Sequence, residues 1–242
     1  MLKFIELWPG FVGGGISGIA TLVGALPILV NTSKLRAILS KINMDFLIGF
    51  MLSAAAFSLI LPAYSSVLKN ETVSMAVSFE TLSLSLVLGF YFIKLTGQFL
   101  EKALIGKEKN LESKKAFLFV IAMMVHNFPE GLAAGATMQL PGSKGYSLLG
   151  AIALQNIPEG FTTALSFLTL GLSPFTAFLG AAMTGVVELA GGLVGAYLSS
   201  SIDGVLPLLM SFAGGTMMSV VVSEILEKIK LESYSFIYRP SF

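Results

Sequence analysis

The sequence predicts an all-α protein, a polytopic membrane helix bundle. Of its 242 residues, 55% are hydrophobic and only 12% are charged, whereas about a quarter of the residues of an average soluble domain are charged. The hydrophobic residues form long runs, and a helix needs roughly 20 mostly apolar residues to cross a bilayer. Composition and run length together predict a single transmembrane domain that covers residues 1–242 and has the lipid bilayer as its solvent.

Seven runs are long enough to span a membrane, and short connections join most of them. Only residues 101–115 form a long charged loop, so nothing predicts a separate soluble domain. Glu6, Trp8 and Pro9 interrupt what would be the short apolar core of a secretory signal, so the first run is interpreted as a span. The predicted spans are about 8–31, 44–68, 74–100, 116–139, 145–170, 173–199 and 204–227.

Charge and cysteine content narrow the class of protein further. The net charge is +1, so no strongly acidic partner and no nucleic acid is predicted. The absence of cysteine excludes disulfides and thiolate metal ligands.

Cytoplasmic loops of membrane proteins are enriched in lysine and arginine. With the N-terminus outside, eleven basic residues fall on the inner side and only Lys3, Lys69 and Lys144 on the outer side, so we predict that orientation.

Two glycine clusters predict close contacts between helices. Small residues spaced four apart on one face of a membrane helix allow two backbones to approach each other. The clusters comprise Gly13, Gly14, Gly15 and Gly18 in the first span, and Gly191, Gly192 and Gly195 in the sixth.

A polar motif occurs twice in the middle of apolar runs. The segment "HNFPEG" at 126–131 is followed, 29 residues on, by "QNIPEG" at 155–160, and Glu188 lies another 29 residues along the chain. A buried charge in a membrane helix costs about 2.5–3.5 kcal/mol on insertion scales. No lysine or arginine lies in the middle of a span, so protonation, water or a bound cation must offset three glutamates.

The spacing within the motif favours a cation. Residues three or four apart share a helix face, which groups His126, Asn127 and Glu130 on one span and Gln155, Asn156 and Glu159 on the next. We expect Pro129 and Pro158 to break their helices and free the carbonyl groups of residues 125 and 154. These faces together would offer imidazole, amide, carbonyl and carboxylate ligands to one or two divalent ions.

The kind of ion and the kind of activity follow from the ligands. One imidazole with several oxygens suits zinc, iron or manganese better than magnesium. The spacing of His126 and Glu130 leaves open an intramembrane metal-dependent hydrolase, and the carboxylates leave open a proton-coupled carrier without metal. A zinc enzyme typically uses three fixed protein ligands and a separate base. A single histidine, with polar residues spread over three helices, favours a permeation route over an enzyme.

The two copies of the motif resemble the signature of the ZIP (Zrt/Irt-like) family of divalent-metal transporters, in its GufA-like bacterial branch, and the likeness extends over nearly the whole chain. The resemblance implies an integral protein of the bacterial cytoplasmic membrane that imports divalent metal, zinc first, with iron, manganese and cadmium as other cargoes. The metal is then the transported substrate, and no cofactor is expected. Whether the chain forms a homodimer is left open.

The resemblance also implies two adjoining metal sites between spans four and five. The family has eight spans with both termini outside, so an eighth span is expected to be missing here, and the C-terminus is expected inside. Glutamine stands at 155, where many relatives have histidine. The first implied site comprises His126, Glu130, Gln155 and Glu159, with Met51 as a thioether neighbour. The second comprises Asn127, Asn156 and Glu188 with the shared Glu130 and Glu159.

Overall fold

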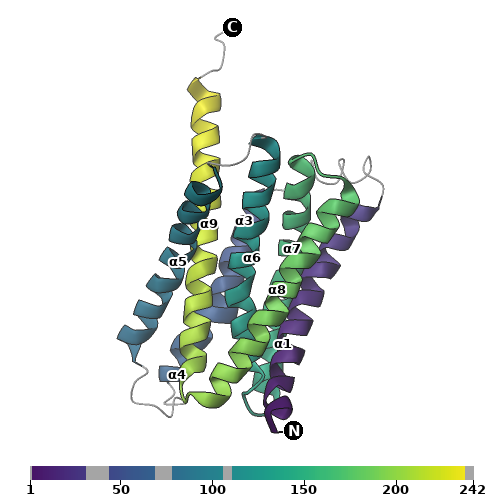
Figure 1. Cartoon of the computed structure of the whole chain (residues 1–242). Helices are drawn as coiled ribbons and strands as arrows, with labels where there is room; N and C mark the ends of the chain where they lie inside the picture. The colour runs from purple at the N-terminus through teal and green to yellow at the C-terminus, as the bar shows by residue number, and fades with distance from the viewer. Residues whose placement is uncertain (1, 31–43, 69–77, 106–110, 238–242) are drawn as a thin grey trace.

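The computed structural model describes residues 2–30, 44–68, 78–105 and 111–237. These residues form a bundle of helices with no strand among them, and the start of α1 and the end of α9 lie at opposite ends of the bundle (Figure 1). The all-α prediction is therefore confirmed. The elements are α1 (Leu2–Ala25), η1 (Leu26–Leu29), α3 (Met44–Ala54), the π-helical η2 (Ala55–Ile60), α4 (Leu61–Leu68), α5 (Phe79–Ile105), α6 (Leu111–Thr137), α7 (Ser143–Thr169), α8 (Pro174–Ser201) and α9 (Val205–Ile237).

Five stretches of the described residues are both long and apolar enough to cross a membrane. Helices α6 and α7 have 27 residues each, about 40 Å at 1.5 Å per residue, which is also long enough to cross a bilayer. Large apolar side chains such as Phe57 and Phe99 are exposed on the outer surface, as lipid contact requires. The five stretches are Leu7–Leu29, Ile48–Leu68, Phe79–Leu100, Pro174–Ser201 and Val205–Ser223.

The helix ends differ from the predicted span ends. Helix α5 extends into the predicted loop 101–115 as far as Ile105, and α6 begins within that loop at Leu111. A helix does not have to end where the bilayer does. The basic segments 31–43, 69–77 and 106–110, on which part of the predicted orientation rests, lie outside the described residues.

The helices pack in two groups. Helices α1, α6, α7 and α8 form one group, while the second span (α3, η2 and α4), α5 and α9 form the other; the groups meet mainly where α6 contacts α9 (Figure 1). Both copies of the polar motif belong to the first group.

The glycine clusters lie where backbones meet, as predicted. A Cβ added at Gly14 would come within 2.8 Å of the Leu189 Cα, and one added at Gly192 within 2.6 Å of the Gly14 Cα, so α1 and α8 could not keep this distance with larger residues. Gly15 is different: its nearest neighbour would be the Leu189 Cδ1 at 4.0 Å, and packing does not require glycine there.

The prolines of the motifs do not break their helices. Helix α6 continues through Pro129 and α7 through Pro158, so the expectation of broken helices was wrong. A proline removes one backbone hydrogen bond, but membrane helices tolerate that loss when neighbouring helices support the segment. The irregular backbone lies instead in the second span, at the π-helical turn Ala55–Ile60.

Candidate metal centre

The two copies of the motif bring one imidazole and two carboxylates together between α6 and α7. One ligand atom each of His126, Glu130 and Glu159 lies within 4.8 Å of the others. The His126 Nε2 is 3.5 Å from the Glu130 Oε1 and 3.4 Å from the Glu159 Oε1. In a tetrahedral zinc site with bonds of about 2.1 Å, neighbouring ligand atoms are about 3.4 Å apart. Small side-chain shifts would therefore allow all three to bind one ion.

Most ligand atoms of this cluster have no hydrogen-bond partner in the described part of the chain. They are both imidazole nitrogens of His126, both carboxylate oxygens of Glu159 and the Glu130 Oε2. All three side chains are at most 1% exposed, and buried polar groups are normally hydrogen-bonded. No lysine or arginine is among the buried residues that the structure describes. The cluster thus has the properties of a cation site.

Gln155 lies beside the cluster, but protein atoms occupy both ends of its amide. Its Nε2 donates to the Glu130 Oε1 at 3.1 Å, and its Oε1 accepts from the Ser58 hydroxyl at 3.3 Å. Ser58 lies in the π-helical turn of the second span, and π-helical turns occur frequently at functional sites. Sequence reasoning missed Ser58, because nothing in the local pattern indicates which face of that span meets α7.

Glu188 is as deeply buried as the other two glutamates, but its environment is different. Its Oε1 accepts from the Thr21 hydroxyl at 2.5 Å and the Asn127 amide at 2.8 Å. Its Oε2 accepts from the Ser17 hydroxyl and the Asn156 amide, both at 2.5 Å. The structure thus brings Asn127, Asn156 and Glu188 together as predicted, with the amide nitrogens as donors. Ser17 and Thr21 were missed, although their spacing of four on a glycine-rich span was a signal.

The glycine that ends each copy of the motif allows another backbone to approach. A Cβ added at Gly131 would lie 2.7 Å from the Glu188 Cα, and one added at Gly160 would lie 2.7 Å from the Thr21 carbonyl carbon. Glutamate followed by glycine therefore places a candidate ligand beside a helix crossing, which is how α8 and α1 come so close to the cluster.

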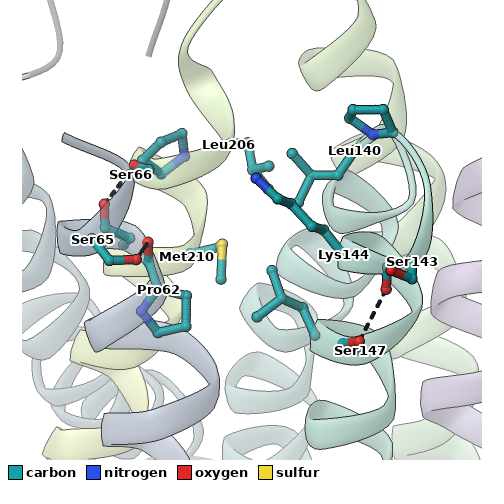
Figure 2. A pocket seen from close by; sticks show the side chains of 13 residues that line it. Pro62, Ser65, Ser66, Leu140, Ser143, Lys144, Ser147, Leu206 and Met210 are labelled. Atoms are coloured by element: carbon teal, nitrogen blue, oxygen red, sulfur yellow. Dashed lines mark hydrogen bonds between the residues drawn. The ribbon is translucent and has the colours of Figure 1, made fainter. Parts of the chain in front are cut away.

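A pocket of about 590 Å³ opens at the end of the bundle where α6 ends and α7 begins. Pro62, Ser65 and Ser66 of α4 face Lys144 at the start of α7 across it (Figure 2). Its floor includes Met210, which packs in an apolar cluster with Leu59, Ala133, Ile152 and others. Ala133 and Ile152 are each about one helical turn from Glu130 and Gln155, so this apolar layer separates the pocket from the polar cluster.

Two further residues complete the comparison with the prediction. Met51 lies partly buried on α3, and its role as a ligand stays a prediction. Thr163, one turn beyond Glu159 on α7, has a buried hydroxyl without a hydrogen-bond partner among the described residues.

The fold and the site define an integral membrane helix bundle with buried carboxylates and an imidazole clustered between two of its helices. The chain belongs to the ZIP family, as its motifs indicated: the family model described as "ZIP Zinc transporter" matches residues 106–238. The chain is 35% identical over 222 residues to "Zinc transporter GufA" of Myxococcus xanthus, and the aligned residues cover 90% of this chain and 87% of that protein. It is 34% identical over 138 residues to "Zinc transporter ZIP11" of Xenopus tropicalis, and the aligned residues cover 52% of this chain and 41% of that protein.

Proposed function

We propose that the protein imports divalent metal cations, zinc first, through the His126, Glu130 and Glu159 cluster. The observation that carries this proposal is the set of buried ligand atoms without hydrogen-bond partners on these three residues. A divalent ion would neutralise the two carboxylates and occupy the lone pairs that no donor of the described residues fills. Both relatives named above are called zinc transporters, which supports zinc as the cargo.

The mixed ligand set also fits other cargoes. Imidazole and carboxylate ligands are common to zinc, iron and manganese sites, so iron, manganese and cadmium remain candidates. The metal is a substrate that must leave, and a site with one imidazole and shared carboxylates holds it less rigidly than a structural zinc site. We assign the protein no enzymatic activity and no cofactor.

The route through the bundle follows from the two groups of helices. The pocket in front of the apolar layer is the outer mouth, if the N-terminus is outside as the distribution of basic residues predicts. Movement of α1, α6, α7 and α8 against the other group would open the layer and give the cluster access to one side at a time. The buried hydroxyl of Thr163 then lies on the inner side of the cluster.

The test is metal uptake by purified protein in liposomes. The protein should take up Zn²⁺ and Cd²⁺, and replacing Glu130 and Glu159 together by alanine should abolish uptake, because the cluster would lose both of its carboxylates. Glu80→Gln is the matched control, since Glu80 is exposed at the start of α5 and should leave uptake unchanged. Uptake that persists in the double variant would overturn the proposal.

The same liposomes separate the other two interpretations of the sequence. Proton flux that does not depend on added metal would indicate a carrier without metal. Metal-dependent cleavage of membrane peptides, lost in His126→Ala, would indicate a hydrolase. No observation on the described residues favours either over transport.

A further inference from the structure

Ser58 connects the second span to the candidate metal centre. Its side chain is 2% exposed and lies in the π-helical turn Ala55–Ile60. Its hydroxyl lies 3.3 Å from the Gln155 Oε1 and also within donating reach of the Ala54 carbonyl of its own span. A hydroxyl has one proton and two lone pairs, so it donates to only one of these oxygens at a time. When it donates to Ala54, its lone pairs are free to accept from Gln155.

The Gln155 amide can face this hydroxyl with either of its ends. In the structure its Nε2 donates to the Glu130 Oε1 at 3.1 Å, and its Oε1 faces Ser58. A half-turn about the last side-chain bond exchanges nitrogen and oxygen and leaves the shape of the amide nearly unchanged. In a chain without a cation, that exchange would set two acceptor oxygens against each other. The nitrogen therefore stays toward Glu130.

A cation bound to Glu130 reverses this preference. Neighbouring ligand atoms of a tetrahedral zinc ion are about 3.4 Å apart. An oxygen in the present position of the Gln155 Nε2, 3.1 Å from the Glu130 Oε1, is therefore placed to share an ion with that carboxylate. The amide nitrogen then donates to the Ser58 hydroxyl, whose own proton goes to the Ala54 carbonyl. Both ends of the amide keep a partner in each arrangement, because a hydroxyl both donates and accepts.

We propose that Ser58 is a positioning residue that allows the Gln155 amide to turn its oxygen toward an arriving cation. This inference rests on the proposed function and specifies how Gln155 joins the His126, Glu130 and Glu159 cluster. Ser58 acts through the amide and does not contact the ion. Without the Ser58 hydroxyl, the turned amide would leave a buried N–H group unpaired, and an unpaired buried donor is costly.

The first experiment measures Zn²⁺ affinity of the full chain in detergent by competition with a fluorescent zinc chelator. Ser58→Ala should weaken Zn²⁺ binding about tenfold, a difference of about 1.4 kcal/mol, and Ser58→Thr, which keeps the hydroxyl, should restore it. Ser211→Ala is the matched control. Ser211 is also fully buried, but its hydroxyl donates to the Leu82 carbonyl of α5. An equal loss in Ser211→Ala would overturn the proposal.

A double-mutant cycle tests whether Ser58 acts through Gln155. Gln155→Leu removes the amide at similar size and should itself weaken binding, because the ion loses an oxygen ligand. Adding Ser58→Ala to Gln155→Leu should then have no further effect on Zn²⁺ affinity. Effects of the two substitutions that simply add would show that the residues act independently, and this result would overturn the proposal.

Infrared difference spectra test the turn of the amide in the native chain. Glutamine labelled with ¹³C at the side-chain carbonyl enters at three positions, 98, 139 and 155. Gln98 is exposed on α5, and the Gln139 amide donates to the Ala196 carbonyl, so neither lies in the cluster. Zn²⁺ should shift one labelled carbonyl band to lower frequency, and the shift should be absent in Gln155→Leu.

The outcomes distinguish this inference from the proposed function. A native protein that binds Zn²⁺ without a shift of the glutamine band would overturn the inference whether or not any variant folds, and would leave the cluster as the binding site. Unchanged affinity in folded Ser58→Ala would do the same. A native protein that binds no Zn²⁺ would overturn both.

Discussion

At the scale of single residues, burial by itself does not identify a metal ligand. Glu130, Glu159 and Glu188 are each at most 1% exposed, and each would cost about 2.5–3.5 kcal/mol if unpaired in a membrane. Hydrogen bonds to charged groups contribute about 1.5–3 kcal/mol each, so the four donors to Glu188 can offset its burial without a cation. No hydroxyl or amide of the described residues donates to Glu159, whose Oε1 lies 3.4 Å from the His126 Nε2, and this difference marks it as the stronger ligand candidate.

Gln155 gives a prediction at the same scale. Its side chain is 1% exposed and reaches to 3.1 Å from the Glu130 Oε1, so an imidazole at this position would meet an ion bound to Glu130. Gln155→His should tighten Zn²⁺ binding about tenfold, because imidazole is a better zinc ligand than an amide. Competition with a fluorescent zinc chelator measures the change.

The control for that variant is Gln98→His, because Gln98 is exposed on α5. A histidine there adds an imidazole to the protein without adding one to the cluster. Equal tightening in both variants would show that the effect does not arise at the site.

At the scale of helices, each copy of the motif combines a candidate ligand with a crossing point. Glu130 is followed by Gly131, against which α8 passes, and Glu159 by Gly160, against which α1 passes. Ligand position and helix packing are thus specified by neighbouring residues, so a change in one disturbs the other.

Gly160→Ala tests this coupling. The added methyl group would overlap the Thr21 backbone, and overpacking of this kind costs about 1–3 kcal/mol. We expect a lower unfolding temperature in detergent together with weaker Zn²⁺ uptake. Gly150→Ala on the same helix is the control, since a Cβ there meets nothing within 4 Å; an equal loss in that variant would contradict the role of the crossing.

At the scale of the whole molecule, the pocket and the orientation can be tested together. Lys144 lines the pocket at the start of α7, and Ala103 is exposed near the end of α5, on the side predicted to be cytoplasmic. The natural chain has no cysteine, so a single introduced thiol reports on its own position.

In intact cells, Lys144→Cys should react with a membrane-impermeant maleimide, and Ala103→Cys should react only after the cells are opened. The physical reason is that short loops rich in lysine and arginine stay on the cytoplasmic side of the membrane, and the predicted excess of basic residues is on the side of Ala103. The reverse pattern of labelling would invert the orientation and make the pocket an inner exit. Labelling of Ala103→Cys but not of Lys144→Cys in opened cells would show that the pocket does not admit the reagent.

The sequence by itself determined the class of fold, the location of the polar centre and the family. Long apolar runs must be helical in lipid because every backbone group has to be hydrogen-bonded internally, and the two copies of the motif place His126, Glu130 and Glu159 on adjacent helices. It did not determine that α6 and α7 continue through Pro129 and Pro158, because neighbouring helices support a backbone that proline weakens locally.

Only the tertiary structure decided which buried glutamate has protein partners. Ser17 and Thr21 are more than 160 residues from Glu188 in the chain, and no local pattern relates a hydroxyl in the first span to a carboxylate in the sixth. Their contact depends on glycines on α1 and α8 that allow two backbones to meet. A side chain's partners in a membrane depend on which helix faces are in contact, and that is a property of the assembled bundle.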